Sequence, residues 1–206
     1  IGRWLLESIY EANRKLNITI NVTILTRSVE AFNAKEPHLV NCKEFSFVAG
    51  DIVDFNDDIS GDFDYMIHAA TEASASLNET NPRKMFNTIV NGTQNMLDFS
   101  TKKSIGKVLF LSSGAIYGQQ PWEMKYVSEG WNGSLDCCNP TNTYAEAKRA
   151  AEMACSIYAK QFGSVISIAR IFSLLGPHLP IDTHFAAGNF IRDSINGKKI
   201  IVNGNG

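Results

Sequence analysis

The fold is decided by three runs that follow one another along the chain: KVLFLS (residues 107–112), TYAEAKRAAEMACSIYA (143–159) and VISIAR (165–170). The first and third runs are short and mostly apolar, which is typical of buried strands. The second run is rich in alanine and has neither proline nor glycine, so it is expected to form a helix. A strand, a helix and a second strand in this order indicate a βαβ unit of a mostly parallel sheet.

The same alternation continues on both sides of this unit. Ahead of it we expect a helix at 3–16, strands at 20–25, 45–49 and 64–68, and a helix at 81–103. Beyond it we expect a helix at 184–196 and a strand at 199–202. The fold class is therefore α/β, with a Rossmann-like doubly wound parallel sheet.

Both ends of the chain depart from the usual pattern of such a fold. A doubly wound nucleotide-binding fold normally begins with a strand and a glycine-rich turn that holds a pyrophosphate at the N-terminus of the next helix. This chain opens on Ile1-Gly2 and runs directly into the first expected helix, and it ends on the turn-like NGNG (203–206). We therefore expect a piece of a longer protein, truncated at both ends, in which Gly2 is the last glycine of that turn.

The composition argues against several classes of protein. The 206-residue chain carries 19 basic and 21 acidic side chains, so nothing in its charge favours a nucleic-acid partner or an anionic membrane. No apolar run reaches the length of a bilayer span. The four cysteines show no metal-binding spacing, and Cys137 and Cys138 are adjacent, which is a poor geometry for an ordinary disulfide. We expect a reduced, cytoplasmic protein without a metal site.

Tyr144 and Lys148 are the first candidates for chemistry. They are four residues apart in the expected helix and therefore lie on one face of it. A free tyrosine has a pKa of ~10 and is a poor base at neutral pH, but a nearby cation favours its phenolate. The pair can then act as a general acid/base. Such pairs also arise by chance, so other residues must support this interpretation.

Ser113 is the next candidate, in the octapeptide LSSGAIYG (111–118). In an open parallel sheet, ligands bind beyond the carboxyl ends of the strands. Ser113 is therefore expected close to the point where the helix of Tyr144 arrives. A hydroxyl there can donate to a substrate carbonyl or alkoxide while Tyr144 moves the proton. The alternative is a serine-rich turn that only caps the strand.

These residues resemble the extended branch of the short-chain dehydrogenase/reductase family, and within it the NAD-dependent nucleotide-sugar epimerases and dehydratases. The resemblance rests first on Ser113 with Tyr117-Gly118, and on Tyr144-Ala145-Glu146-Ala147-Lys148. It extends over nearly the whole chain. The further matching motifs, each weak alone but in the family's order, are Ile1-Gly2, Gly50-Asp51-Ile52, residues 64–70, Gly92-Thr93-Gln94-Asn95, residues 170–177 and residues 203–206.

The resemblance implies a role for each matching position. It implies a catalytic triad of Ser113, Tyr144 and Lys148. The implied cofactor-binding residues are Gly2, Arg27, Asp51, Ile52, Ala69, Ala70, Thr71 and Lys148, and the implied substrate-binding residues are Ser173, His178, His184 and Asn189. The implied domains are a dinucleotide-binding Rossmann domain (1–170) and the start of a substrate-binding region (171–206). Each role has an alternative. Asp51 can be a solvated loop acid, Ala69 and Ala70 can serve only close packing, and the four substrate-binding residues can be bystanders.

The end of the strand at 20–25 bears on the choice of cofactor. An acid there would bind the ribose 2′-hydroxyl of NAD, whereas an arginine suits the 2′-phosphate of NADP. The chain has Thr26-Arg27 and no acid at this place. We therefore expect NADP or NAD, with NADP slightly favoured. The alternative is that Arg27 is a solvated charge or stacks on the adenine, which either cofactor permits.

The reaction implied by the resemblance is hydride transfer between a sugar carbon and the nicotinamide of an NAD(P) cofactor, with Tyr144 as the acid/base. The family's 4,6-dehydratases carry an Asp-Glu pair directly after the catalytic hydroxyl residue, where this chain has Gly114 and Ala115. An epimerase or a 4-keto reductase acting on a nucleotide sugar is therefore expected rather than a typical dehydratase.

Two other outcomes stay open, together with the oligomeric state. A protein of this fold can keep its dinucleotide and lose its chemistry, and a truncated piece can be inactive although its parent is an enzyme. The helices at 81–103 and 142–162 have apolar faces that suit a four-helix homodimer interface, as in relatives.

Overall fold

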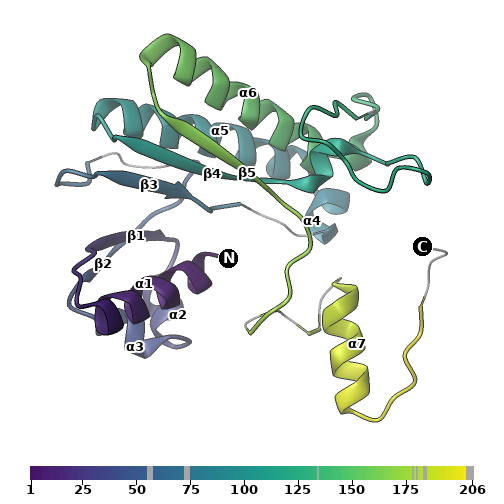
Figure 1. The fold of residues 1–206 in the computed structure, drawn as a ribbon, viewed down its shortest axis with the longest axis horizontal. Coiled ribbons are helices and arrows are strands. Elements are labelled where there is room, and N and C mark those ends of the chain that lie inside the picture. The colour runs from purple at the N-terminus through teal and green to yellow at the C-terminus, as the bar shows by residue number, and fades with distance from the viewer. Residues whose placement is uncertain are drawn as a thin grey trace. The chain divides into compact units, whose positions relative to one another are not determined.

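The computed structural model describes residues 1–54, 58–71, 75–133, 135–177, 179, 181–182 and 185–202. It separates into two compact units, Ile1–Arg170 and Ile171–Gly206. Figure 1 labels the helices and strands of each unit. The functional roles expected for these two parts of the chain stay predictions.

The first elements of the chain form a two-stranded sheet with short helices. They are α1 (Gly2–Leu16), β1 (Val22–Thr26), α2 (Val29–Asn33), α3 (Pro37–Val40) and β2 (Phe45–Ala49). β1 and β2 are parallel, and Thr26 at the end of β1 lies opposite Ala49 at the end of β2. Leu6, Leu39 and Phe45 form a small core between α1, α3 and β2.

The remaining elements of the first unit form a second sheet with two long helices. They are β3 (Tyr65–His68), α4 (Ala75–Thr80), α5 (Pro82–Lys102), β4 (Lys107–Ser113), the 3₁₀ turns η1 (Gly114–Tyr117) and η2 (Pro140–Asn142), α6 (Thr143–Phe162) and β5 (Ile166–Ile171). The strand order is β3-β4-β5, and β3 and β4 are parallel. The second unit contains one described helix, α7 (Ala186–Ile195).

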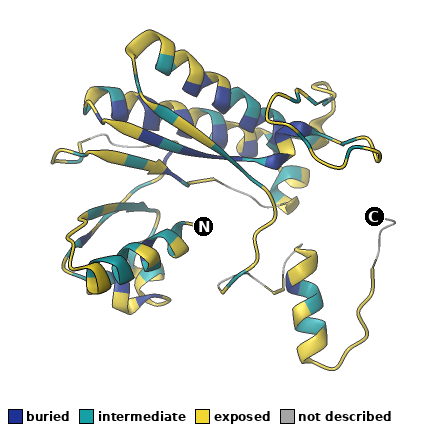
Figure 2. Ribbon diagram, viewed as in Figure 1, coloured by how far each residue is buried: buried dark blue, intermediate teal, exposed yellow. Residues whose placement is uncertain are grey.

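The main core lies between α5, α6 and β4. Its buried side chains come from all three elements and include Met85, Ile89, Leu97, Phe110, Ala147, Ala151 and Cys155. Figure 2 shows buried segments in dark blue along α5, α6 and β4. Because α6 contributes mostly alanines to this core, its backbone comes close to β4.

The α/β class expected from the sequence is confirmed, but the described strands form two parallel sheets rather than one. In the classic doubly wound order 3-2-1-4-5-6, strand 1 lies between the group 3-2 and the group 4-5-6. The two-stranded sheet β2-β1 matches the group 3-2, and the three-stranded sheet β3-β4-β5 matches the group 4-5-6. In that order β1 and β3 are not neighbours. No described helix is both long enough and apolar enough to cross a membrane.

The element boundaries differ from the expected ones in a few places. The strand at 45–49 is found with the expected bounds. The strand expected at 199–202 is wrong, since these described residues belong to no strand. Its branched residues favour an extended backbone, but a strand also needs a neighbour to accept and donate its backbone hydrogen bonds. The short helices α2 and α3 were not expected; Ser28 caps the first through Ala31 N, and Pro37 begins the second.

Candidate active site

Ser113 is the last residue of β4 and also caps the 3₁₀ turn that follows. Its Oγ accepts a hydrogen bond from the backbone N–H of Ala115 at 3.2 Å. This bond occupies a lone pair of the oxygen and leaves the hydroxyl proton available for another acceptor. The half-buried Ser113 is therefore oriented, and it can still donate to a ligand oxygen.

Tyr144 lies in the first turn of α6, and a residue from another helix fixes that turn. Asn142, at the N-cap of α6, makes no capping bond through its side chain. Instead the backbone N–H of Tyr144 donates to Asn78 Oδ1 at 3.0 Å, and Asn78 Nδ2 donates to the Thr141 carbonyl at 2.9 Å. Asn78 of α4 thus supplies the cap that a helix start normally takes from its own N-cap residue.

Lys148 is one turn further along α6 and is almost completely buried, with 2% of its surface exposed. Its Nζ donates to the Leu111 carbonyl at 2.8 Å and lies 4.9 Å from the centroid of the Phe110 ring. Burial lowers the pKa of Lys148 from 10.5 to about 8, against the opposing effects of Glu152 and Cys155. The lysine is therefore an ionisable group whose pKa is close to neutral, attached to β4 two residues before Ser113.

His68 ends β3 and faces the same interior. Thr93 uses its single hydroxyl proton to donate to the Ile89 carbonyl at 2.6 Å. His68 Nε2, 3.0 Å from Thr93 Oγ1, must therefore be the donor in that bond, which assigns the proton to Nε2. Burial, followed by the charge of Lys148, lowers the pKa of His68 to about 3, so the ring is neutral.

Residues expected to bind a dinucleotide lie at the carboxyl ends of β1, β2 and β3. Arg27 and Asp51 follow the neighbouring strands β1 and β2, whose ends are joined by a 2.9 Å hydrogen bond from Gly50 N to the Thr26 carbonyl. The small residues Ala69, Ala70 and Thr71 follow β3, and Gly2 begins α1. Small residues, a cation and an acid at the carboxyl ends of parallel strands are typical of a dinucleotide-binding fold.

Ile52 is the exception among these residues. It is buried, and a Cβ placed on Gly92 of α5 would come within 2.9 Å of its side chain. Asn95 Nδ2 donates to the carbonyls of Ile52 and Val53 at 2.9 and 3.0 Å. The side chain and carbonyl of Ile52 are thus used in packing against α5, and its role in binding a cofactor stays a prediction.

The expected substrate-binding residues belong to the second unit. Ser173 is exposed, and Asn189 on α7 accepts a hydrogen bond from Arg192 at 3.1 Å. His178 and His184 lie outside the described residues. The part they play in a site stays a prediction.

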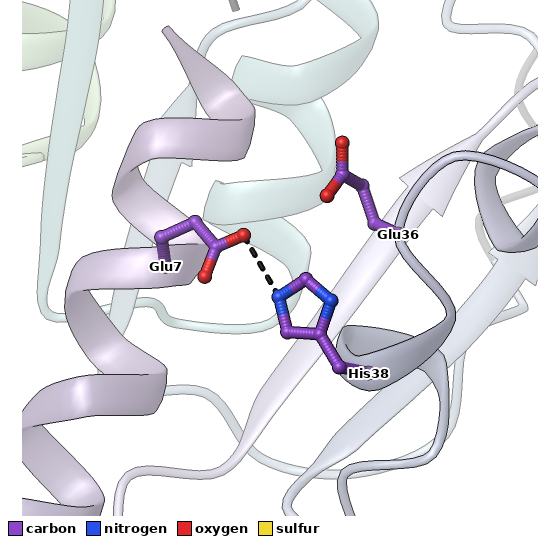
Figure 3. A group of neighbouring side chains, drawn as sticks. All are labelled: Glu7, Glu36 and His38. Atoms are coloured by element: carbon purple, nitrogen blue, oxygen red, sulfur yellow. Dashed lines mark hydrogen bonds and ion pairs between the residues drawn. The ribbon is translucent and has the colours of Figure 1, made fainter. Parts of the chain in front are cut away.

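A separate cluster at α1 and α3 consists of Glu7, Glu36 and His38, whose ligand-type atoms lie within 4.8 Å of one another (Figure 3). His38 Nε2 is 2.9 Å from Glu7 Oε1. Glu36 is buried and forms an ion pair with Arg3 of α1. The guanidinium already balances this carboxylate, so we assign the cluster no metal.

The sequence reasoning did not identify Asn78, His68 or Glu152 as residues that hold the site. Glu152 is one turn beyond Lys148 and is nine-tenths buried with two hydrogen-bonding partners, Ser112 and Arg170. The turn spacing from Lys148 to Glu152 is visible in the sequence and was the available signal for Glu152. The contacts of Asn78 and His68 join distant parts of the chain; His68 lies in the matching stretch 64–70, but no role was expected for its side chain.

The parallel strands, the covering helices and the arrangement of Ser113, Tyr144 and Lys148 on β4 and α6 define a Rossmann-like α/β protein of the short-chain dehydrogenase/reductase type. The family model described as "NAD dependent epimerase/dehydratase family" matches residues 1–206. The chain belongs to this family.

Individual relatives are similar over most of this chain. UDP-glucuronic acid decarboxylase 1 of Xenopus tropicalis is 29% identical over 185 residues, which cover 90% of this chain and 42% of the relative. UDP-glucuronic acid decarboxylase 6 of Arabidopsis thaliana is 34% identical over 139 residues, which cover 68% of this chain and 40% of the relative. The chain thus spans about two fifths of the length of these curated relatives.

Solved structures share the fold. UDP-glucuronic acid 4-epimerase from Bacillus cereus, in complex with NAD, aligns with a TM-score of 0.77 at 21% identity over 100% of this chain and 63% of that chain. UDP-N-acetylglucosamine 4-epimerase from Methanobrevibacter ruminantium M1 aligns with a TM-score of 0.74 at 25% identity over 90% of this chain and 58% of that chain.

Replacing the buried charge should stabilise the protein. The lowering of the Lys148 pKa from 10.5 to about 8 corresponds to about 3 kcal/mol of penalty. Lys148→Met keeps the length of the side chain and removes the charge, so near neutral pH we expect a gain of about 1–2 kcal/mol after loss of the hydrogen bond to Leu111. Urea unfolding of the wild type and of Lys148→Met measures this difference in the free energy of unfolding.

The pH dependence of the stability gain in Lys148→Met checks that the gain comes from the buried charge. The penalty is complete below the folded pKa of about 8 and vanishes as the pH rises toward the unfolded value of 10.5, so the advantage of Lys148→Met should shrink over this interval. Lys160→Met, at an exposed position of the same helix, is the control and should show no gain. A Lys148→Met variant that is less stable near neutral pH would contradict the interpretation.

Proposed function

We propose that the protein is an NAD(P)-dependent nucleotide-sugar oxidoreductase that transfers hydride at a sugar carbon, with Tyr144 as the acid/base. The observation that carries the proposal is the anchoring of Lys148 to the Leu111 carbonyl, one helical turn after Tyr144 and two residues before Ser113 on β4. Membership of the epimerase/dehydratase family supports the reaction type.

The cofactor, when bound, supplies a nicotinamide that accepts or returns the hydride. Tyr144 takes the proton of the sugar hydroxyl as the carbon is oxidised and returns it on reduction. Ser113 donates its hydroxyl proton to the same sugar oxygen and steadies it. Lys148 supplies a positive charge one helical turn from Tyr144, which stabilises the transient phenolate, and it orients the nicotinamide ribose.

We propose a nucleoside-diphosphate sugar as the substrate, with UDP-glucuronic acid as the first probe. The similar decarboxylases are named for this sugar nucleotide, and a solved structure of the Bacillus cereus epimerase contains it together with NAD. Gly114 and Ala115 of η1 carry no side chain that can transfer a proton, which favours epimerisation or 4-keto reduction over dehydration. Epimerisation follows if the cofactor is re-oxidised in place, and reduction follows if it leaves after each turnover.

The first test of this function is the variant Tyr144→Phe in the intact protein. It removes only the phenolic oxygen, so turnover of UDP-glucuronic acid with NAD(P) should fall by about 100-fold or more while dinucleotide binding is retained. Tyr126→Phe, at an exposed loop tyrosine, is the matched control and should keep wild-type turnover. Full turnover in Tyr144→Phe would overturn the assignment of the acid/base. A wild-type protein that binds the dinucleotide but converts no sugar nucleotide would indicate the non-catalytic alternative.

We propose that Arg27 gives the protein a preference for NADP over NAD. It follows β1 directly, beside the end of β2, where an adenosine ribose lies in this fold. Arg27→Ala should weaken NADPH binding by about 10-fold and leave NADH binding unchanged, because a charge-assisted contact to the 2′-phosphate is lost. Fluorescence titration measures both affinities. Arg14→Ala, at an exposed position of α1, is the control. Equal or NAD-favoured binding in the wild type, unaffected by Arg27→Ala, would retire the NADP preference.

We propose that a second copy of the chain covers the outer face of α5 and α6. Exposed apolar side chains lie there, among them Phe86, Met153 and Ile157, and Figure 2 shows that α6 has many exposed positions. A dimer in solution should dissociate in the variant Ile157→Glu and persist in Leu16→Glu, an exposed position on α1. Light scattering at micromolar concentration decides this, and a monomeric wild type would rule the dimer out.

The cytoplasmic location expected from the sequence stays a prediction. Its support is that all four cysteines are free, which suits a reducing compartment.

A further inference from the structure

The residues around Glu152 form a charge network that the proposed reaction does not use. Ser112 Oγ donates to Glu152 Oε1 at 2.6 Å. Arg170 donates to both carboxylate oxygens, through Nε at 3.1 Å to Oε1 and through Nη2 at 2.8 Å to Oε2. Ser112 and Glu152 are both buried. A buried carboxylate with this many donors is held in one place.

Arg170 is itself fixed by other contacts, so it holds the Glu152 carboxylate in one position. Its Nη1 donates to the Tyr117 hydroxyl at 2.9 Å and to the Glu129 carbonyl at 2.7 Å. Its guanidinium carbon lies 5.0 Å from the centroid of the Tyr117 ring. The hydrogen bond from Arg170 to Glu152 further raises the pKa of the guanidinium, which therefore stays charged.

The register between α6 and β4 places this carboxylate beside the candidate active site. Lys148 and Glu152 are one helical turn apart on one face of α6. Lys148 contacts the carbonyl of Leu111, and Glu152 contacts the hydroxyl of the next residue, Ser112. Two successive turns of the helix thus bind two successive residues of the strand that ends in Ser113.

Glu152 is the charged group that acts on Lys148 within the described part of the chain, one helical turn away, while its carboxylate is bound by Arg170 and Ser112. The other titratable groups that act on Lys148 or feel its charge are Cys155 on α6 and His68 on β3. Burial raises the pKa of the Cys155 thiol to about 12, and the pKa of His68 is lowered to about 3, so both are neutral near neutral pH. β4 contributes only the Phe110 ring and the Leu111 carbonyl to the ammonium.

We propose that Glu152 is a positioning residue that acts through Lys148: held by Ser112 and Arg170, it is the counter-charge that keeps the buried ammonium protonated and in register with β4. The catalytic consequence rests on the proposed function of Lys148. The electrostatic relation between the two side chains does not, so it can be measured separately.

The experiment is a pH titration of the Lys148 side chain by NMR in the intact protein labelled at lysine, with the signal assigned from its absence in Lys148→Met. In Glu152→Gln, which keeps the shape and loses the charge, the midpoint should lie lower than in the wild type by about one pH unit. Glu146→Gln, on the same helix and paired with Arg149, is the matched control and should leave the midpoint unchanged. The same midpoint in Glu152→Gln and the wild type would overturn the proposal.

Two further variants separate charge from packing. Glu152→Asp keeps the charge, so its midpoint should stay close to that of the wild type even if the protein melts at a lower temperature. If Glu152→Gln does not fold because Arg170 loses its partner, the double variant Glu152→Gln/Arg170→Met is compared with Arg170→Met, so that the two proteins differ only in the charge at position 152. The same midpoint in these two variants would also overturn the proposal.

The activity readout tests the catalytic consequence. The alkaline limb of kcat/KM should move down in pH with the Lys148 midpoint in Glu152→Gln and stay in place in Glu146→Gln. A moved midpoint with an unmoved pH profile would show that Glu152 acts on Lys148 but that the proposed function of Lys148 is wrong. A wild-type protein without turnover would also show that the proposed function of Lys148 is wrong, and the NMR titration would still decide the role of Glu152.

Discussion

One ammonium group must be held inside this protein away from water, and the packing of the main core follows from that constraint. Lys148 Nζ donates to the Leu111 carbonyl at 2.8 Å and lies over the Phe110 ring. The helix comes close enough to the strand because Ala147 and Ala151, both fully buried, present only methyl groups to the core. A backbone carbonyl inside a strand is fixed by its neighbours, so the sheet itself determines where the charge lies.

Helix α5 connects this interior to the strand ends at which a dinucleotide is expected. Thr93 accepts the hydrogen bond of His68 at the end of β3, and Asn95 binds the carbonyls of Ile52 and Val53 after β2. Gly92 leaves the space that the Ile52 side chain fills. The motif Gly92-Thr93-Gln94-Asn95, which the sequence offered only as a resemblance, thus has a physical explanation at three of its four positions.

The sequence predicted those features whose signal is local. The strand at 45–49 and the βαβ unit from β4 to β5 were found because hydrophobic pattern and helix propensity act over a few residues. The contacts of the residues that hold the candidate site were missed because their partners are far away in the chain. Asn78 contacts Tyr144, 66 residues later, Glu152 contacts Ser112, 40 residues earlier, and His68 contacts Thr93, 25 residues later. The strand expected at 199–202 failed for the related reason that pairing is a property of two segments.

Packing alone gives no reason for an ammonium at position 148. An apolar side chain of the same length would fill the volume between α6 and β4 without any cost of desolvation. Around it the protein keeps His68 and Cys155 neutral, so among the described groups that act on Lys148 only Glu152 carries a charge. A buried cation that depends on a single carboxylate responds sharply to its surroundings. Its charge, rather than its bulk, is therefore the property that the surrounding residues maintain.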